Sequence, residues 1–212
     1  MRHLPILDLR VRTPRLELRL GDLARLDELA DLAQQGIHPP EQMPFGVPWT
    51  DSPDPARSTV QFQLLQLASW TPESWSFNPV VICEGRVVGT QGMSATQFRQ
   101  SRSFTTGSWL GRAYQGQGIG REMRAAILQF AFSALGAEEA LSGAFWDNPA
   151  SLAVSRQLGY FANGEELVSR RGLPTRQLRL RLPRQAWLAR PASPVQVDGL
   201  EGCLDWFLGP GA

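Results

Sequence analysis

The sequence predicts an α+β fold in which helices flank one central β-sheet as a sandwich. Three observations lead to this prediction. Short segments alternate apolar and polar residues, a mid-chain segment carries an apolar stripe at helical spacing, and the two kinds of segment are mixed along the chain. The predicted order is a strand, two helices, three strands, a helix, a strand, a helix and further strands. Such an order suits one central sheet, in an α+β or an α/β arrangement.

The N-terminal part is predicted to contain one strand and two helices. Residues 16–20 alternate leucine with charged residues, which is typical of a half-buried strand. Asp22 is a suitable N-cap for a helix with an apolar face of leucine and alanine. Six prolines break residues 36–55 into a loop, and the aromatic segment 43–49 within it is expected to line a pocket or to pack over the sheet. A second helix is predicted over residues 56–70.

The central and C-terminal parts alternate strands with helices. Strands are predicted over residues 79–83 and 87–95, joined by a tight turn at Glu84-Gly85-Arg86, and over residues 105–110 and 139–146. Helices are predicted over residues 118–135, where apolar residues form a continuous stripe, and over 149–158, where Gly159 ends the helix. Two more strands near 167–170 and 177–182 and an apolar run at 203–208 complete the pattern.

Composition excludes several classes of function. The chain has 212 residues, 42% of them hydrophobic, and no divider rich in Pro, Gly and Ser, so one domain over residues 1–212 is expected. A net charge of +1 gives no argument for a nucleic acid or an anionic membrane as partner. Cys83 and Cys203 are isolated, so no metal site is expected. Because there is no signal-like or membrane-spanning apolar run, the expected location is the cytoplasm.

The segment Gln115-Gly116-Gln117-Gly118-Ile119-Gly120 lies between a predicted strand and a predicted helix. Its glycines let backbone N–H groups turn toward one point, and the helix adds unpaired N–H groups and a positive dipole end. This arrangement predicts an anion site, with a pyrophosphate as the obvious ligand. The Lys-Ser/Thr ending of a P-loop is missing, and the glycine spacing does not match a dinucleotide fingerprint, which makes a nucleotide-binding protein improbable.

The segment matches the pattern Q/R-x-x-G-x-G/A and so resembles the coenzyme A loop of the GNAT superfamily of N-acyltransferases. A second block, from Asn148-Pro149-Ala150-Ser151 to Gly159-Tyr160, is similar to the next conserved region of that superfamily and lies about one helix and one strand further on. The opening residues 12–16, Arg-Thr-Pro-Arg-Leu, look most like the RimJ/RimL-like branch. The resemblance implies a mixed, mostly antiparallel sheet, splayed at the two strands around the loop, with residues 183–212 as a C-terminal extension packed on it.

The resemblance also implies the chemistry. An amine would attack the thioester of acetyl-CoA or another acyl-CoA, without a metal. The acceptor would be a protein N-terminus, a lysine or a small-molecule amine. In the family, a backbone N–H before the loop binds the oxyanion, here near Trp109 and Leu110. The implied coenzyme A contacts are Trp109, Leu110, Gln115, Gly116, Gln117, Gly118, Ile119, Gly120, Arg121, Asn148 and Ser151.

Candidate catalytic residues are Ser151, positioned by Asn148, as a donor to the leaving thiolate, and His38 as a base. Many family members carry a tyrosine about four residues beyond this serine, where the present chain has Val154 and Ser155. Helix capping alone would also explain Asn148 and Ser151. The base could instead be Glu165 or Glu166, or there could be no dedicated base.

Several further alternatives stay open. Arg112 and Arg121 could bind phosphates or only face solvent. Acetyl is the expected acyl group, but a longer one such as succinyl could pair its distal carboxylate with Arg170 or Arg171. A non-catalytic acyl-CoA-binding module is the alternative to an enzyme. Trp187 and Trp206 suggest that the tail packs on the body or on a partner subunit, and a homodimer is expected.

Overall fold

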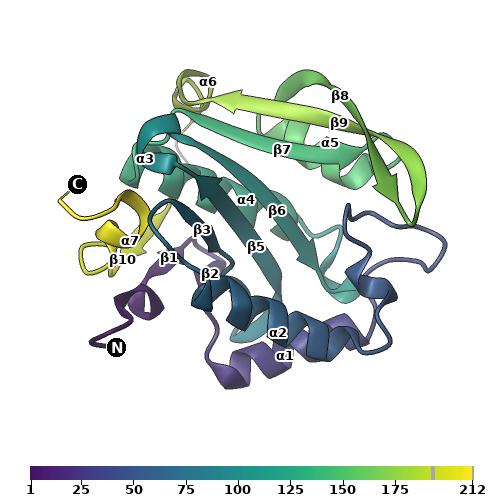
Figure 1. Cartoon of the computed structure of the whole chain (residues 1–212), viewed down its shortest axis with the longest axis horizontal. Coiled ribbons are helices and arrows are strands. Elements are labelled where there is room, and N and C mark those ends of the chain that lie inside the picture. Colours follow the sequence, from purple (N-terminus) through teal and green to yellow (C-terminus); the bar gives the residue numbers. More distant parts are fainter. Residues whose placement is uncertain (192–193, 212) are drawn as a thin grey trace.

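One large twisted sheet forms the centre of the protein and carries helices on both faces (Figure 1). The computed structural model describes residues 1–191 and 194–211. Within them, ten strands share one sheet, whose bounds are β1 Arg10–Arg12, β2 Leu16–Arg19, β3 Ser74–Phe77, β4 Val80–Cys83, β5 Arg86–Thr96, β6 Ser103–Leu110, β7 Glu139–Phe145, β8 Phe161–Arg170, β9 Leu173–Pro183 and β10 Gln196–Asp198. The strand order is β10-β1-β2-β4-β5-β6-β7-β9-β8, with β3 paired beside β4 on the long strand β5. This is the α+β sandwich that the sequence predicts.

Two helices cover one face of the sheet. They are α1 (Leu23–Gln34) and α2 (Pro55–Ala68), which lie together at the bottom of Figure 1. Each begins at an aspartate whose carboxylate accepts the backbone N–H three residues on, Asp22 from Arg25 and Asp54 from Arg57. Leu26, Leu29 and Leu32 of α1 pack against strand residues of β4 and β5. The two helices therefore start where local capping signals place them.

The opposite face is covered by α4 (Ile119–Gln129) and α5 (Pro149–Gln157). The predicted helix over residues 118–135 changes to a π-helical turn at Phe130–Ala134. Phe130 packs against Phe77 and Phe207, whereas Phe132 packs against Phe104 and Trp187. The wider turn lets two nearby aromatic rings serve two different parts of the core.

The sheet opens between β6 and β7, which form the one parallel pair among the described strands. Only Ser103, Phe104 and Thr105 of β6 pair with β7, opposite residues 139–141. By contrast, β6 stays paired with β5 from Thr105 to Leu110. The two strands therefore diverge beyond Thr105, as Figure 1 shows, and we call the gap between their backbones the splay. The expectation of a mostly antiparallel sheet splayed next to the glycine loop is confirmed.

The N-terminal residues and the C-terminal helix α7 lie at the same end of the sheet, away from the glycine loop (Figure 1). Strand β10 adds to β1, and the last helix, α7 (Leu204–Leu208), packs Phe207 among Trp70, Trp75 and Phe77. Trp187, in α6 (Arg184–Leu188), is buried and donates to Gln129 of α4 at 2.9 Å. The segment after β9 thus packs against the body of the same chain.

Some elements differ from their predicted extents. Strand β8 begins at Phe161, well before the predicted start near residue 167. The prediction missed this part because its residues are exposed and a bulge lies between Ala162 and Glu165, so the sequence shows no alternation there. Strands β1, β3 and β10 and the short helix α3 (Phe98–Ser101) were not predicted. They have three or four residues each, too few to show a period. No helix in the described parts is long and apolar enough to cross a membrane.

Candidate active site

The glycine loop connects the end of β6 to the start of α4 through a short 3-10 turn at Arg112–Tyr114. Gly116 and Gly118 have φ values of 74° and 78°, which strain any residue with a Cβ. Gly118 is the N-cap of α4, and no side chain caps this helix. The first N–H groups of α4 therefore remain free for a ligand, and nothing lies within 4 Å of a Cβ placed on Gly116. An open, uncapped helix start fits the pyrophosphate of coenzyme A.

The side chains of the loop support its backbone. Gln115 donates from Nε2 to the carbonyls of Leu110 and Ile37, each at 2.9 Å, which ties the loop to the end of β6 and to the segment after α1. Gln117 donates to the carbonyl of Ala113 at 2.7 Å. Arg112 and Arg121 are exposed, and within the described chain neither forms an ion pair. The structure thus places both glutamines in supporting positions and leaves the glycine backbone open.

Arg15 is a loop neighbour that the sequence did not single out. It donates to the carboxylate of Glu122, in the first turn of α4, at 2.6 Å, and to the carbonyl of Gln117 at 3.4 Å. Thr13 also donates to Glu122, at 2.5 Å. An unpaired Glu122 would repel phosphate oxygens at this helix start, so its pairing with Arg15 makes the loop more favourable for an anion.

Backbone N–H groups of β6 point into the splay. Gly111 donates its N–H to the carbonyl of Val88 on β5. Along a strand, successive N–H groups point to opposite edges. The N–H of Trp109 therefore points toward β5, whereas the N–H groups of Ser108 and Leu110 point away from it. Since β7 is unpaired with this part of β6, the N–H groups of Ser108 and Leu110 face the opening. These two donors are available for a developing oxyanion.

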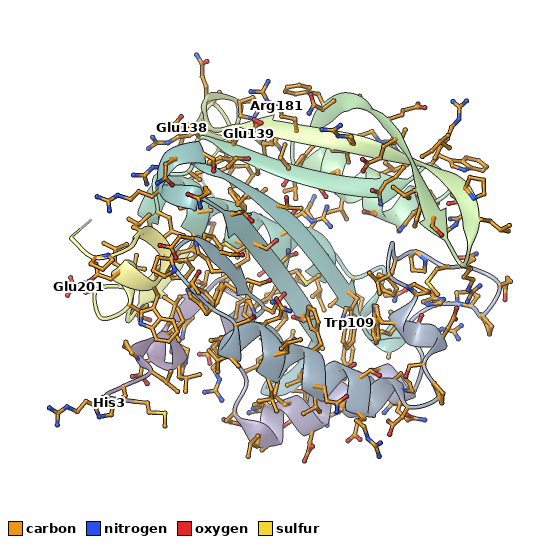
Figure 2. The ribbon with its side chains drawn as sticks, viewed as in Figure 1. His3, Trp109, Glu138, Glu139, Arg181 and Glu201 are labelled. Atoms are coloured by element: carbon orange, nitrogen blue, oxygen red, sulfur yellow. The ribbon has the colours of Figure 1, made fainter. Side chains whose placement is uncertain are left out.

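The side chain of Trp109 lies on the α1/α2 face of the sheet. Figure 2 shows it at the loop end of β6, and it packs against Trp49 with ring centroids 5.5 Å apart. Trp49 in turn contacts Phe45, and Phe45 contacts His38. The aromatic part of the Pro-rich loop is therefore connected to β6 beside the splay.

Both ring nitrogens of His38 are engaged. Nδ1 donates to the carbonyl of Pro39 at 2.9 Å, and Nε2 lies 2.8 Å from the hydroxyl of Thr50. With Nδ1 protonated, Nε2 carries the lone pair and accepts from Thr50. His38 can therefore act as a base only through Thr50 or after that hydrogen bond opens. Figure 2 shows the other histidine, His3, at the N-terminal end and far from Trp109.

Asn148 and Ser151 form the start of α5. The Oδ1 atom of Asn148 accepts from the N–H of Ser151 at 3.1 Å, and Pro149 occupies the first helical position. The structure thus shows that Asn148 caps α5. Ser151 is half-buried at the beginning of α5, which follows β7 on the far side of the splay.

Three of the four charged candidates on the β8–β9 hairpin, Glu165, Arg170 and Arg171, have charged partners. Glu165 lies 3.2 Å from Arg176, whereas Glu166 is exposed. Arg170 binds Asp147 with two hydrogen bonds and lies over the ring of Phe145 at 4.5 Å. Arg171 binds Asp51 in the same bidentate way. These hydrogen bonds lower the pKa of both aspartates.

A buried polar cluster lies between α4, α5 and β6, and the sequence did not reveal it. Arg124 of α4 is only 6% exposed and donates to Ser155 of α5 at 3.0 Å and to Ser108 of β6 at 3.3 Å. Tyr160 lies beside it, 3.4 Å from Thr106, and burial raises the pKa of this phenol. An arginine in an otherwise apolar helix face was the only signal. Elsewhere in the described parts, no group of three or more His, Cys, Asp or Glu could hold a metal.

Comparison with known proteins identifies this arrangement. A family model described as an acetyltransferase (GNAT) domain matches residues 15–160. A putative ribosomal-protein-serine acetyltransferase from Vibrio cholerae is similar in structure, with a TM-score of 0.66 and 21% identity over 84% of this chain and 98% of that one. RimL, a ribosomal-protein alpha-N-acetyltransferase in complex with coenzyme A, has a TM-score of 0.64 and 21% identity over 81% of this chain and 95% of that one.

A chimera of the spermidine N-acetyltransferase SpeG from Vibrio cholerae and hSSAT has a similar fold at a lower sequence identity. Its TM-score is 0.65, with 16% identity over 83% of this chain and 99% of that one. At these identities the solved structures establish the shared fold. The family match spans the glycine loop, the splay and α5. The chain therefore belongs to the GNAT acetyltransferase family and is an acyl-CoA-dependent N-acyltransferase.

Proposed function

We propose that this enzyme moves an acetyl group from acetyl-CoA to a primary amine by direct attack of the amine on the thioester. The observation that carries the proposal is the presence of two separate sets of unpaired donors, one at the end of β6 and one at the start of α4. The N–H groups of Ser108 and Leu110 face the splay, and the uncapped start of α4 follows after a short connection. The donors of β6 suit a carbonyl oxygen that becomes negative, and those of α4 suit a pyrophosphate.

The residues of the splay would perform three tasks. The N–H groups of Ser108 and Leu110 stabilise the oxyanion as the amine attacks. Ser151, at the start of α5, is a donor for the leaving sulfur, and Asn148 fixes the turn on which it lies. The attacking amine must be neutral, so its proton passes to His38 through Thr50, to Glu165 or to water.

A groove on the α2 face offers a place for the acceptor. It has a volume of about 500 Å³, and Thr105, the residue of β6 at which the splay opens, is one of its lining residues. Its lining combines hydroxyl and apolar groups without any charged side chain: Phe62, Gln66, Ser69, Ser74, Trp75, Ser76, Ser94, Ala95, Thr96 and Thr105. A polycation such as spermidine would find no carboxylate there. The groove supports an acceptor whose residues next to the reacting amine are uncharged and polar, such as a protein N-terminus.

Acetyl is the first choice of acyl group because the arginines of the hairpin tip are occupied. Arg170 and Arg171 each bind an aspartate in a bidentate pair, so neither is free to bind a distal carboxylate. We further propose that residues 1–212 act as one domain with 183–212 as its packed extension, supported by the contacts of Trp187 and Phe207. The location in the cytoplasm and the homodimer stay predictions, the latter to be tested by light scattering.

The proposed function is tested by following thiol release from acetyl-CoA and succinyl-CoA with a panel of acceptors. The panel contains peptides with free N-termini, the same peptides with blocked N-termini, a lysine side-chain analogue and spermidine. We expect turnover with acetyl-CoA and free N-termini. Coenzyme A binding without thiol release for any amine would favour the non-catalytic module. A preference for succinyl-CoA would overturn the acetyl assignment.

A further inference from the structure

The guanidinium of Arg124 is a buried cation without an anionic partner. The residue is 6% exposed, and its two hydrogen-bond acceptors, Ser155 and Ser108, are neutral hydroxyls. Its Nε–H has no acceptor, and among the described residues no carboxylate lies within 4.0 Å of the side chain. An arginine stays charged at neutral pH, and a buried charge is normally paired. The site is therefore complete only when an anion or a strong acceptor arrives.

The position of Arg124 indicates which anion this is. Its side chain bridges α4, α5 and β6, and Ser108, which it contacts, also directs its own N–H into the splay. Tyr160, the titratable group nearest to this cluster, does not supply the charge, because burial raises the pKa of its phenol and keeps it protonated. The missing anion must therefore enter from the splay itself.

The transfer reaction creates negative charge at two atoms. The carbonyl oxygen becomes an oxyanion, for which the N–H groups of Ser108 and Leu110 are available. The sulfur becomes a thiolate when it leaves, and α5 carries no tyrosine or other acidic side chain that could protonate it. We propose that Arg124 binds and stabilises this thiolate, held in place by Ser155 and Ser108. The inference rests on the proposed acyl transfer.

The step is balanced as follows. The amine nitrogen forms a bond to the carbonyl carbon, the C–S bond breaks, and its electron pair remains on sulfur. The amine proton passes to the base or to water. Arg124 donates a hydrogen bond to sulfur and keeps its own proton, and the thiolate takes up a proton from solvent after release.

The ionisation of bound coenzyme A tests this proposal directly. The ultraviolet absorbance of the thiolate is measured against pH for coenzyme A bound to the protein, with the complex of desulfo-coenzyme A subtracted to remove protein signals. A free thiol has a pKa of about 8.5, and a nearby cation lowers a pKa by about 1 to 3 units. In the wild-type complex we expect a decrease of at least about one unit. In Arg124→Met this decrease should disappear.

The controls separate this role from a structural one. Desulfo-coenzyme A should bind wild type and Arg124→Met with affinities within about twofold, since Met fills a similar volume and the lost contact is to sulfur. Arg156→Met, an exposed arginine next to Ser155 on α5, should leave the thiol pKa unchanged. If Arg124→Met does not fold, Ser155→Ala removes one of the two hydroxyls that hold the guanidinium and should give an intermediate thiol pKa.

Two results would overturn the inference. One is an identical thiol pKa in wild type and the Arg124 variant. The other is an effect confined to the choice between acetyl-CoA and succinyl-CoA, which would assign Arg124 to the acyl chain. The first result leaves the proposed function intact, and the second bears only on its choice of acyl group. That function fails separately if the wild-type protein binds no coenzyme A or releases no thiol.

Discussion

Arg171, at the tip of the β8–β9 hairpin, donates from Nε and Nη2 to the carboxylate of Asp51 at 2.7 and 2.6 Å. Arg171 also donates to the carbonyl of Pro40 at 3.0 Å, so the hairpin tip is tied to both ends of the Pro-rich loop. At the right of Figure 1, the tip of the hairpin reaches the loop between α1 and α2. The contact joins two segments that flank the splay.

Replacing Arg171 by Ala should loosen the loop without unfolding the protein. The pair is partly exposed, so its loss changes global stability little, but three hydrogen bonds that position the loop are removed. We expect the KM for the acceptor to rise by about threefold to tenfold while the affinity for coenzyme A is retained, because about 1 kcal/mol is a factor of five. Arg184→Ala, which breaks the partly exposed pair with Glu138 just after β9, is the control. Equal kinetics in both variants would contradict the prediction.

Gly118→Val should abolish tight coenzyme A binding. A β-branched residue at a φ of 78° is strained by about 1 to 2 kcal/mol, and the loop would distort to relieve the strain. Gly85 in the β4–β5 turn has a φ of 80° and open space around it, so Gly85→Val carries a similar strain far from the loop. Calorimetric titration should show a loss of more than about tenfold, or 1.4 kcal/mol, for the first variant only. An equal loss of coenzyme A affinity in both variants would show that general backbone strain, and not distortion of the glycine loop, causes the loss.

Two variants can distinguish a capping role of Asn148 from a catalytic role. Asn148→Ala removes the hydrogen bond to the N–H of Ser151 and should lower the free energy of unfolding by about 0.5 to 2 kcal/mol. Asn148→Ser restores a cap but not the amide. Urea unfolding and kcat are measured for both variants. We expect the serine variant to recover stability while kcat stays low, and full recovery of both would reduce Asn148 to a helix cap.

The buried thiol of Cys203 should cause the free energy of unfolding to decrease at alkaline pH. Burial raises the pKa of its thiol from 9.0 to about 11. Between these values the unfolded chain loses the proton and the folded chain keeps it, so stability is complete below pH 9.0 and falls as the pH rises toward 11. Urea unfolding from pH 8 to 10.5 should show that the free energy of unfolding decreases by roughly 1 to 2 kcal/mol more in wild type than in Cys203→Ala. Parallel curves would mean that the segment around Cys203 does not bury this thiol.

Local signals in the sequence predicted the elements that hold the coenzyme A side of the site. Gly116 and Gly118 have the positive φ values that their position before a helix suggested, and Asn148-Pro149 begins α5. The apolar stripe predicted a helix over residues 118–135, which forms α4 as far as Gln129 and continues as a π-helical turn to Ala134. Such signals depend on residues a few positions apart, so they can be read without knowing the rest of the fold.

The side-chain contacts around the splay were decided by tertiary structure. Arg124 and its partner Ser155 are 31 residues apart in the sequence, and Arg171 and its partner Asp51 are 120 residues apart. The residues next to either arginine in the sequence do not indicate these partners. The opening of the sheet after Thr105 depends on the register between β6 and β7, which short strands do not encode in their own residues. The sequence by itself therefore determined the family, the fold class and the loop for the acyl donor. Only the folded chain placed a buried, unpaired cation beside the splay, because long-range packing, and not spacing, brought those side chains together.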